Sequence, residues 1–168
     1  MAVIIRKLEP ADAQAFKDLR VFAMTESPRA FGSSVMDEQN RSLESIKIMF
    51  SSSVSFGLGV FDSDTLIGLA RCECSNRIKT KHKADIFGVY IHPNYRGKGL
   101  ARRLLEQLIS QAKAIDGLET LLLAVAEHNA PALALYQSLG FLEWGKEPDA
   151  LRHEGERLTE VYMRLELI

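Results

Sequence analysis

The sequence has few of the features that mark secreted, metal-binding or disulfide-rich proteins. Its only two cysteines are Cys72 and Cys74. Spaced two residues apart on a strand, they share one face and cannot easily form an unstrained disulfide with each other. We therefore expect reduced thiols in a cytoplasmic protein. Because these cysteines lack companion ligands at a recognisable spacing, we expect no metal site.

Long apolar runs and an excess of one charge are also missing. No apolar run approaches the roughly 20 residues of a membrane-spanning helix, and the N-terminus lacks the basic-then-apolar layout of a signal peptide. The net charge is −1, so electrostatics gives no reason to expect nucleic acid or a membrane as partner. Hydrophobic residues make up 46% and charged residues 26% of the 168 residues. This composition predicts one globular domain over residues 1–168.

The most informative stretch is a predicted strand, loop and helix over residues 84–112. Residues 86–91 are apolar and rich in β-formers, and Pro93 ends this strand because proline donates no ladder hydrogen bond. The loop at residues 96–101 contains two glycines and two cations. The following apolar positions share one helix face, namely Leu100, Leu104, Leu105, Leu108, Ile109 and Ala112. A glycine-rich loop entering a helix N-terminus favours anions, because backbone N–H groups and the helix dipole both face the ligand.

The loop departs from two common phosphate-binding patterns. The P-loop pattern is absent, and the dinucleotide fingerprint starts at Gly97 but meets Arg102 at its third glycine. A plain left-handed turn is the simplest alternative. The loop does contain Arg/Gln-x-x-Gly-x-Gly/Ala, as Arg96, Gly99 and Ala101. That pattern resembles the acyl-CoA pyrophosphate loop of the GNAT superfamily of N-acyltransferases.

A second motif follows in the order that this resemblance requires. Residues 120–125 predict an apolar strand, and Asn129 is well placed to cap a helix that Gly140 ends. The spacing resembles the other GNAT signature, as Val125, Asn129, Ala132, Leu135, Tyr136, Gly140 and Phe141. Two motifs in the right order and context are far more specific than one. A helix cap for Asn129 and a buried helix position for Tyr136 are structural alternatives that are compatible with functional roles.

The rest of the chain predicts strands that pair locally and helices that flank them. We expect a strand over residues 3–8, a helix from Glu9 to about Thr25, a loop over 27–34 and a second helix after Ser42. Two strands over 56–61 and 66–74 are joined by a hairpin turn. The basic run at residues 76–83 is either a clamp for an acidic group or, as we prefer, a solvated hairpin tip.

After the central helix, Gly117 is expected as its C-cap. We expect a strand over residues 141–144, a polar loop over 146–155 that contains Pro148, and a last strand over 158–167. The predicted fold class is α/β (α+β), with a mixed, mostly antiparallel sheet of about seven strands and helices on both faces. The GNAT resemblance adds a splay between the strands near residues 85–91 and 119–125.

The resemblance implies an N-acetyltransferase that moves acetyl from acetyl-CoA, its co-substrate, to a primary amine of a small molecule or peptide. It implies that Tyr136 is the general acid for the leaving thiolate and that Asn129 bonds the pantetheine arm. Backbone groups of one strand would bind the arm and the loop would hold the pyrophosphate, as Val89, Tyr90, Ile91, Arg96, Gly97, Lys98, Gly99, Leu100 and Ala101.

The general base is the least determined role. Some branches of the family carry a glutamate at the position of Ala124, and another branch carries one at the position of Asp85. Asp85 is therefore the candidate base and Glu73 on the adjacent strand is the second. Both can instead be exposed strand-end charges, and water can serve as the base.

Two other function classes stay open at this point. One is a non-catalytic acyl-CoA sensor on the same fold, and the other is a nucleotide-binding domain. Release of CoA in the presence of an amine separates the enzyme from the sensor. The acceptor pocket would be lined by the first two helices, their loop and residues 76–83 and 146–155, whose mixed charges indicate no single substrate. The resemblance is also compatible with a homodimer.

Overall fold

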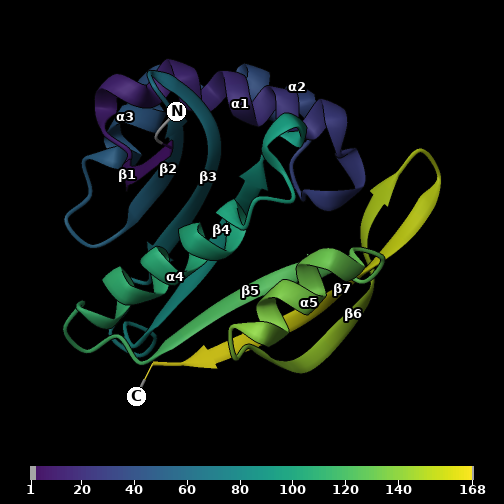
Figure 1. The fold of residues 1–168 in the computed structure, drawn as a ribbon. Coiled ribbons are helices and arrows are strands. Elements are labelled where there is room, and N and C mark those ends of the chain that lie inside the picture. The colour runs from purple at the N-terminus through teal and green to yellow at the C-terminus, as the bar shows by residue number, and fades with distance from the viewer. Residues whose placement is uncertain (1–2, 168) are drawn as a thin grey trace.

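One seven-stranded sheet organises the computed structural model, which describes residues 3–167 (Figure 1). The strand order is β1-β2-β3-β4-β5-β7-β6. All neighbouring strands are antiparallel except β4 and β5. The expected mixed, mostly antiparallel sheet is confirmed. The strands are β1 Val3–Lys7, β2 Phe56–Asp62, β3 Thr65–Cys74, β4 Lys83–Ile91, β5 Thr120–Ala126, β6 Leu142–His153 and β7 Glu156–Glu166.

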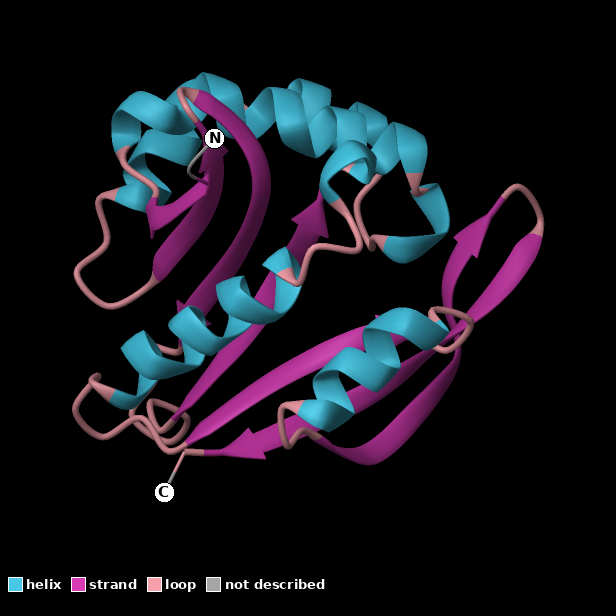
Figure 2. Ribbon diagram, in the orientation of Figure 1, coloured by secondary structure: helices cyan, strands magenta, loops and turns pink. Residues whose placement is uncertain are grey.

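Helices cover both faces of this sheet, as expected (Figure 2). The β3 strand shows why, because Ala70 belongs to one hydrophobic core while its neighbour Leu69 belongs to the other. One core packs under α4 and α5, and the second packs under α1 and α3. The helices are α1 Ala13–Glu26, α2 Val35–Asn40, α3 Leu43–Phe50, α4 Leu100–Lys113 and α5 Ala130–Ser138.

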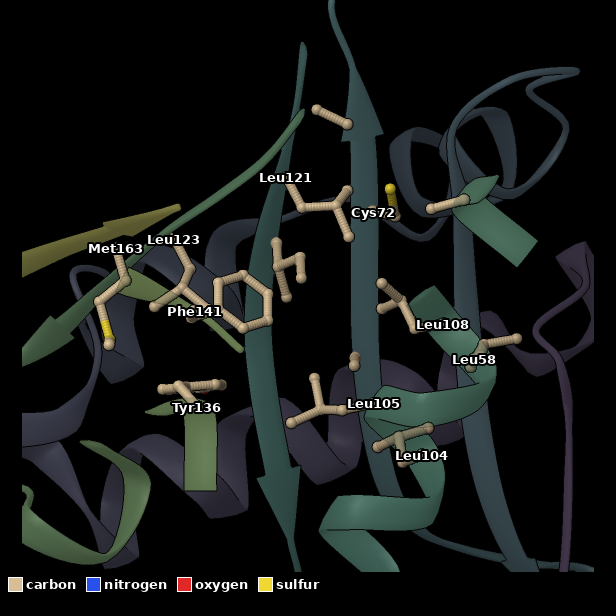
Figure 3. Packing of buried hydrophobic residues seen from close by; sticks show 14 of the residues in the cluster. Leu58, Cys72, Leu104, Leu105, Leu108, Leu121, Leu123, Tyr136, Phe141 and Met163 are labelled. Atoms are coloured by element: carbon tan, nitrogen blue, oxygen red, sulfur yellow. The ribbon is translucent and has the colours of Figure 1, made fainter. Parts of the chain in front are cut away.

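The α4 helix is anchored by the apolar face that its sequence predicts. Leu104, Leu105 and Leu108 are fully buried and point toward the sheet, where Leu58 and Cys72 meet them (Figure 3). Burying one such leucine contributes about 1.5–3 kcal/mol. This packing fixes the N-terminus of α4 at the end of β4, where the glycine loop lies.

Three sequence predictions differ from the structure. Residues 146–155 were expected as a loop, but β6 runs through most of them as an edge strand with a register shift between Glu147 and Leu151. Proline is tolerated at such an irregular edge because its missing N–H breaks no ladder bond there. Gly117 is no helix cap, since α4 ends at Lys113 and Gly117 (φ 73°) lies in the turn beyond. The α2 helix was not predicted.

Within the part of the chain that the structure describes, no helix combines the length and apolarity that crossing a bilayer needs. Cys72 and Cys74 are both free thiols.

Candidate active site

The β4 and β5 strands separate soon after they meet. They pair only over Lys83–Asp85 and Thr120–Leu122, and then diverge (Figure 1). A bulge in β4 accompanies the divergence, because Leu69 faces Tyr90 while Arg71 faces Phe87, so two residues of β4 oppose Ala70. The predicted splay is confirmed. The gap leaves backbone groups of both strands without a neighbouring strand.

Gly88 lies in this bulge and meets two constraints that favour glycine. Its φ is +65°, which side chains other than glycine rarely adopt. A Cβ there would also lie 2.8 Å from Nη1 of Arg20. The guanidinium of Arg20 is buried against Glu38 and cannot move freely. The close approach brings a buried cation directly under the gap between the strands.

We expect Gly88→Ala to lower the free energy of unfolding by about 1–3 kcal/mol, from the left-handed backbone and the displaced Arg20. Gly145→Ala is the matched control, because that strand glycine has no positive φ and open space around its Cβ position. Urea unfolding measures both. An equal effect of the two substitutions would contradict the special role of the bulge.

A cleft of about 400 Å³ occupies the gap and extends to the start of α4 and α5. It brings together residues that the sequence places far apart: β4, the loop after it, and α5. The predicted cofactor-binding and catalytic residues on its wall are Val89, Tyr90, Ile91, Arg96, Ala101, Asn129 and Tyr136.

The loop before α4 presents free backbone N–H groups at one end of this cleft, an arrangement that favours an anion. Gly97 and Gly99 have φ of 75° and 72°, and nothing lies within 4 Å of where their Cβ atoms would be. The hydrogen bond from the Arg103 N–H to the Gly99 carbonyl (3.1 Å) is the first of the helix. The N–H groups of residues 100–102 therefore have no helical acceptor. The side chain of Leu100 is buried in the core, so only its backbone can contribute.

Arg96 is held in place by groups outside the loop. Its Nη2 lies 2.8 Å from Oε2 of Glu26, and its Nε donates to the Ile91 carbonyl at 2.9 Å. The Tyr90 hydroxyl donates to the same carboxylate at 3.0 Å. These contacts, led by Arg96, lower the pKa of Glu26 to about 2. The arginine thus ties the loop to the C-terminal end of α1, and its charge is already shared with Glu26.

This ion pair gives stability a defined pH dependence. A lowered folded-state pKa means that the contribution is present above the ordinary pKa of 4.5 and is lost as pH falls toward 2. We expect Glu26→Gln to cost about 1 kcal/mol at pH 7 and progressively less as pH falls through 2. Urea unfolding between pH 2 and 7 measures the difference. Glu119→Gln, whose side chain forms no ion pair with residues 3–167, should show no such dependence.

Asn129 and Tyr136 are positioned by the two ends of α5. Asn129 caps the helix, since its Oδ1 accepts from the Ala132 N–H at 3.3 Å, which leaves the side-chain NH₂ available. At the other end, the Gly140 N–H donates to Gln137 and the Phe141 N–H to Tyr136, a glycine-ended cap as predicted. The Tyr136 ring packs edge-on against Phe141 at 5.9 Å (Figure 3).

Tyr136 is only 7% exposed, and this burial raises the pKa of its phenol. A phenol is protonated at neutral pH even at its ordinary pKa near 10, so this hydroxyl can donate a hydrogen bond to a ligand in the cleft.

A second cavity, of about 520 Å³, lies beside the first. The two share Ile86, Gly88, Leu123 and Ala124 on their walls, so they meet in the gap between β4 and β5. The second cavity is lined by residues of α1, the following loop, β3, β4, β5, β6 and β7. A molecule bound there would face a ligand in the first cleft across the gap.

Two carboxylates line the second cavity, Asp85 and Glu160. Burial, followed by repulsion from Glu73, raises the pKa of Asp85. Burial, followed by repulsion from Glu147, raises the pKa of Glu160. Glu73 itself lines neither cavity and forms an ion pair with Arg71. The structure thus brings the first predicted base to the site and the second one to its periphery.

Sequence reasoning missed Glu160 as a candidate. Strand alternation places it on one face with Tyr162. What was not readable is that β7 lies beside β5, with Glu160 opposite Ala126 and Tyr162 opposite Ala124. That pairing alone brings Glu160 to the cavity.

Comparison with known proteins gives a consistent result. The model of the Acetyltransferase (GNAT) family matches residues 17–141. The L-amino acid N-acyltransferase MnaT of Escherichia coli K12 is 37% identical over 79 residues, which cover 47% of this chain and 45% of that protein. The [ribosomal protein bS18]-alanine N-acetyltransferase of the same organism is 46% identical over 61 residues, covering 36% and 40%. The matched part spans less than half the length of each relative.

Similarity to a solved structure extends over the whole fold. The structure of yncA from Salmonella typhimurium with its cofactor acetyl-CoA has a TM-score of 0.83 and 24% identity, and the match covers 100% of this chain and 95% of that one.

Proposed function

Because the chain belongs to the acetyltransferase (GNAT) family, we propose that it transfers the acetyl group of acetyl-CoA to a primary amine. The observation that carries this proposal is the gap between β4 and β5, which connects an anion-binding loop and Tyr136 on one side to a second cavity on the other. Two substrates bound on the two sides would meet in the gap.

The residues present fit acetyl-CoA as co-substrate. The amides of residues 97–102 suit its pyrophosphate, and the backbone of Val89 and Ile91 can bond the pantetheine arm as a neighbouring strand would. The free NH₂ of Asn129 can bond the same arm. When bound, acetyl-CoA supplies an activated acyl group as a thioester.

The transfer requires a neutral amine. An alkyl amine with a pKa near 10.4 is only about one part in a thousand neutral at pH 7.4. The amine nitrogen attacks the carbonyl carbon, the C–N bond forms and the C–S bond breaks, and the amine proton passes to a base. Asp85 and Glu160 are the carboxylates of the second cavity able to accept it, directly or through water.

Tyr136 assists the leaving group in this proposal. Its phenol, which is protonated at neutral pH, donates to the sulfur as negative charge develops there. The thiolate has a pKa near 8.5 and is already a fair leaving group. The hydroxyl is therefore expected to accelerate the reaction without being indispensable.

A thiol-release assay with acetyl-CoA and a panel of amines tests the proposal. We expect CoA release only when an amine is present, together with one equivalent of acetylated amine by mass spectrometry. Binding of acetyl-CoA without amine-dependent release across the panel would favour a sensor and overturn the proposal.

A further inference from the structure

One buried and one largely buried arginine line the second cavity, and both have unused hydrogen-bond donors. The side chains of Arg20 on α1 and Arg71 on β3 are 7% and 11% exposed. A guanidinium carries five N–H donors. Yet the Nε atom of each is buried and has no acceptor in the described part of the chain. Buried donors of this kind are costly unless a ligand or water satisfies them.

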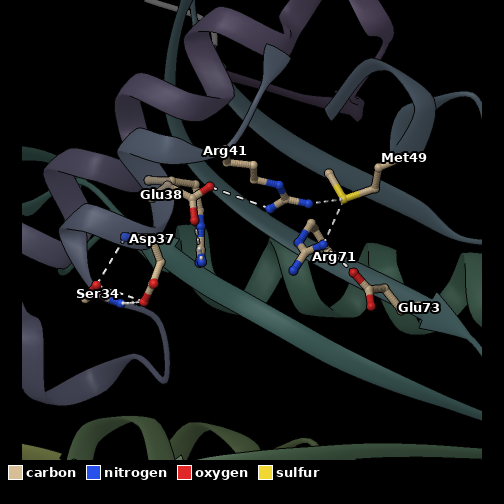
Figure 4. A network of polar contacts seen from close by, with 8 residues as sticks. Ser34, Asp37, Glu38, Arg41, Met49, Arg71 and Glu73 are labelled. Atoms are coloured by element: carbon tan, nitrogen blue, oxygen red, sulfur yellow. Dashed lines mark hydrogen bonds and ion pairs between the residues drawn. The ribbon is translucent and has the colours of Figure 1, made fainter. Parts of the chain in front are cut away.

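The charges around these arginines do not balance. Arg20 and Arg41 share one carboxylate, Glu38, at 3.3 and 3.6 Å, while Arg71 pairs with Glu73 (Figure 4). Three arginines therefore share two glutamates, which leaves one surplus positive charge.

Arg71 also contacts a neutral group that compensates little of its positive charge. Its Nη1 lies 2.8 Å from the sulfur of Met49, a weak acceptor (Figure 4). Burial lowers the pKa of both Arg20 and Arg71. Their charged forms are thus incompletely compensated by the protein, and an anion in the cavity would compensate them.

The other charged groups on the cavity wall are carboxylates, whose negative charge is opposite to that of the two arginines. Asp85 and Glu160 come from β4 and β7 and line the same cavity. Asp85 is also the last residue of β4 that pairs with β5 before the gap opens. The cavity therefore offers cationic groups from α1 and β3, a carboxylate (Asp85) where β4 and β5 part, and a second carboxylate (Glu160) beside the end of β5.

We propose that the amine acceptor also carries a carboxylate, as a free amino acid does, and that Arg71 with Arg20 binds this carboxylate. The inference rests on the proposed acetyl transfer. The amine of such a zwitterion would lie at the gap that leads to the acyl group, where Asp85 is the carboxylate at the point of divergence and Glu160 lies farther along the cavity wall. A peptide N-terminus or a simple alkyl amine has no carboxylate beside its amine and would leave the arginine donors unpaired.

Matched acceptors test this selection. L-Leucine and L-phenylalanine are compared with their amides, which keep the same side chain and nearly the same size but lack the negative charge. We expect kcat/KM to be at least about tenfold higher for the acids, because a site built to hold a charged group rejects the analogue without it. The α-amine of an amino acid amide loses its proton more readily than that of the free acid. Intrinsic reactivity alone would therefore favour the amides.

Substitution of Arg71 tests whether this residue causes the preference for acids over amides. We expect Arg71→Gln to lower kcat/KM for the acids about 100-fold, mainly through KM, and to change the amides less than about threefold. Arg71→Lys should restore part of the loss. Arg77→Gln, an exposed cation of the β3–β4 turn, is the control and should match the wild type. Calorimetric binding of acetyl-CoA shows whether each variant is folded.

The outcomes separate the two levels of the proposal. Three outcomes would overturn carboxylate recognition while leaving acetyl transfer intact. The wild type could use acids and amides equally well, or it could prefer peptides to both. Alternatively, Arg71→Gln could lower kcat/KM equally for acid and amide. If no amine of any class supported CoA release, the proposed function itself would be overturned.

Discussion

Replacement of Tyr136 by phenylalanine is expected to lower kcat by about ten- to a thousandfold while leaving the Kd for acetyl-CoA nearly unchanged. The ring remains to pack against Phe141, so the fold and the cleft wall are preserved. Only the donor to the leaving sulfur is lost. Steady-state kinetics at saturating amine, together with calorimetric titration of acetyl-CoA, separates the two quantities.

Tyr95→Phe is the matched control for this experiment. The Tyr95 hydroxyl donates to Asp62 at 2.8 Å, away from the cleft wall, and its removal should leave kcat unchanged. A Tyr136→Phe enzyme with full turnover would remove the hydroxyl from the mechanism. A large loss of acetyl-CoA affinity would mean that Tyr136 serves in binding instead.

The second large effect is expected from Ala101→Glu. Ala101 lies in the first turn of α4 and on the cleft wall, where the pyrophosphate is proposed to bind. A carboxylate about 5 Å from a phosphate charge costs about 3 kcal/mol at an effective dielectric constant near 20. We therefore expect acetyl-CoA to bind about 100-fold more weakly.

The effect of this substitution on stability has the opposite sign, which makes the test selective. An acidic residue in the first turn of a helix is favourable to the dipole by about 0.3–1 kcal/mol. The variant should therefore unfold no more easily than the wild type while binding acetyl-CoA poorly. Ala15→Glu, at an exposed position of the first turn of α1, is the control and should bind normally. Tight binding by Ala101→Glu would place the pyrophosphate elsewhere.

Local chemistry predicted much of this molecule. The helix face from Leu100 to Ala112, the two-residue turn between β2 and β3, and the caps at Asn129 and Gly140 all follow from residues close together in sequence. The glycine loop could be placed at a helix N-terminus because its glycines directly precede apolar residues at helical spacing. These elements needed no knowledge of the sheet.

Features that depend on strand order could not be read in the same way. Glu160 reaches the cavity only because β7 lies beside β5, and Glu73 pairs with Arg71 on its own strand instead of facing the cavity. The sequence around Pro148 predicts a loop, but the segment is part of β6. The register shift that accommodates the proline arises from pairing with β7 and cannot be inferred from local preference. The link between Arg96 and Glu26 joins residues far apart in sequence.

Amide hydrogen exchange with and without acetyl-CoA tests the central claim most directly, since the account places this molecule in the gap between β4 and β5. We predict that acetyl-CoA slows exchange at residues 86–91 and 97–102 and leaves β1, at the far edge of the sheet, unchanged. Acetyl-CoA that binds without protecting either segment, or that produces no protection at millimolar concentration, would contradict the account.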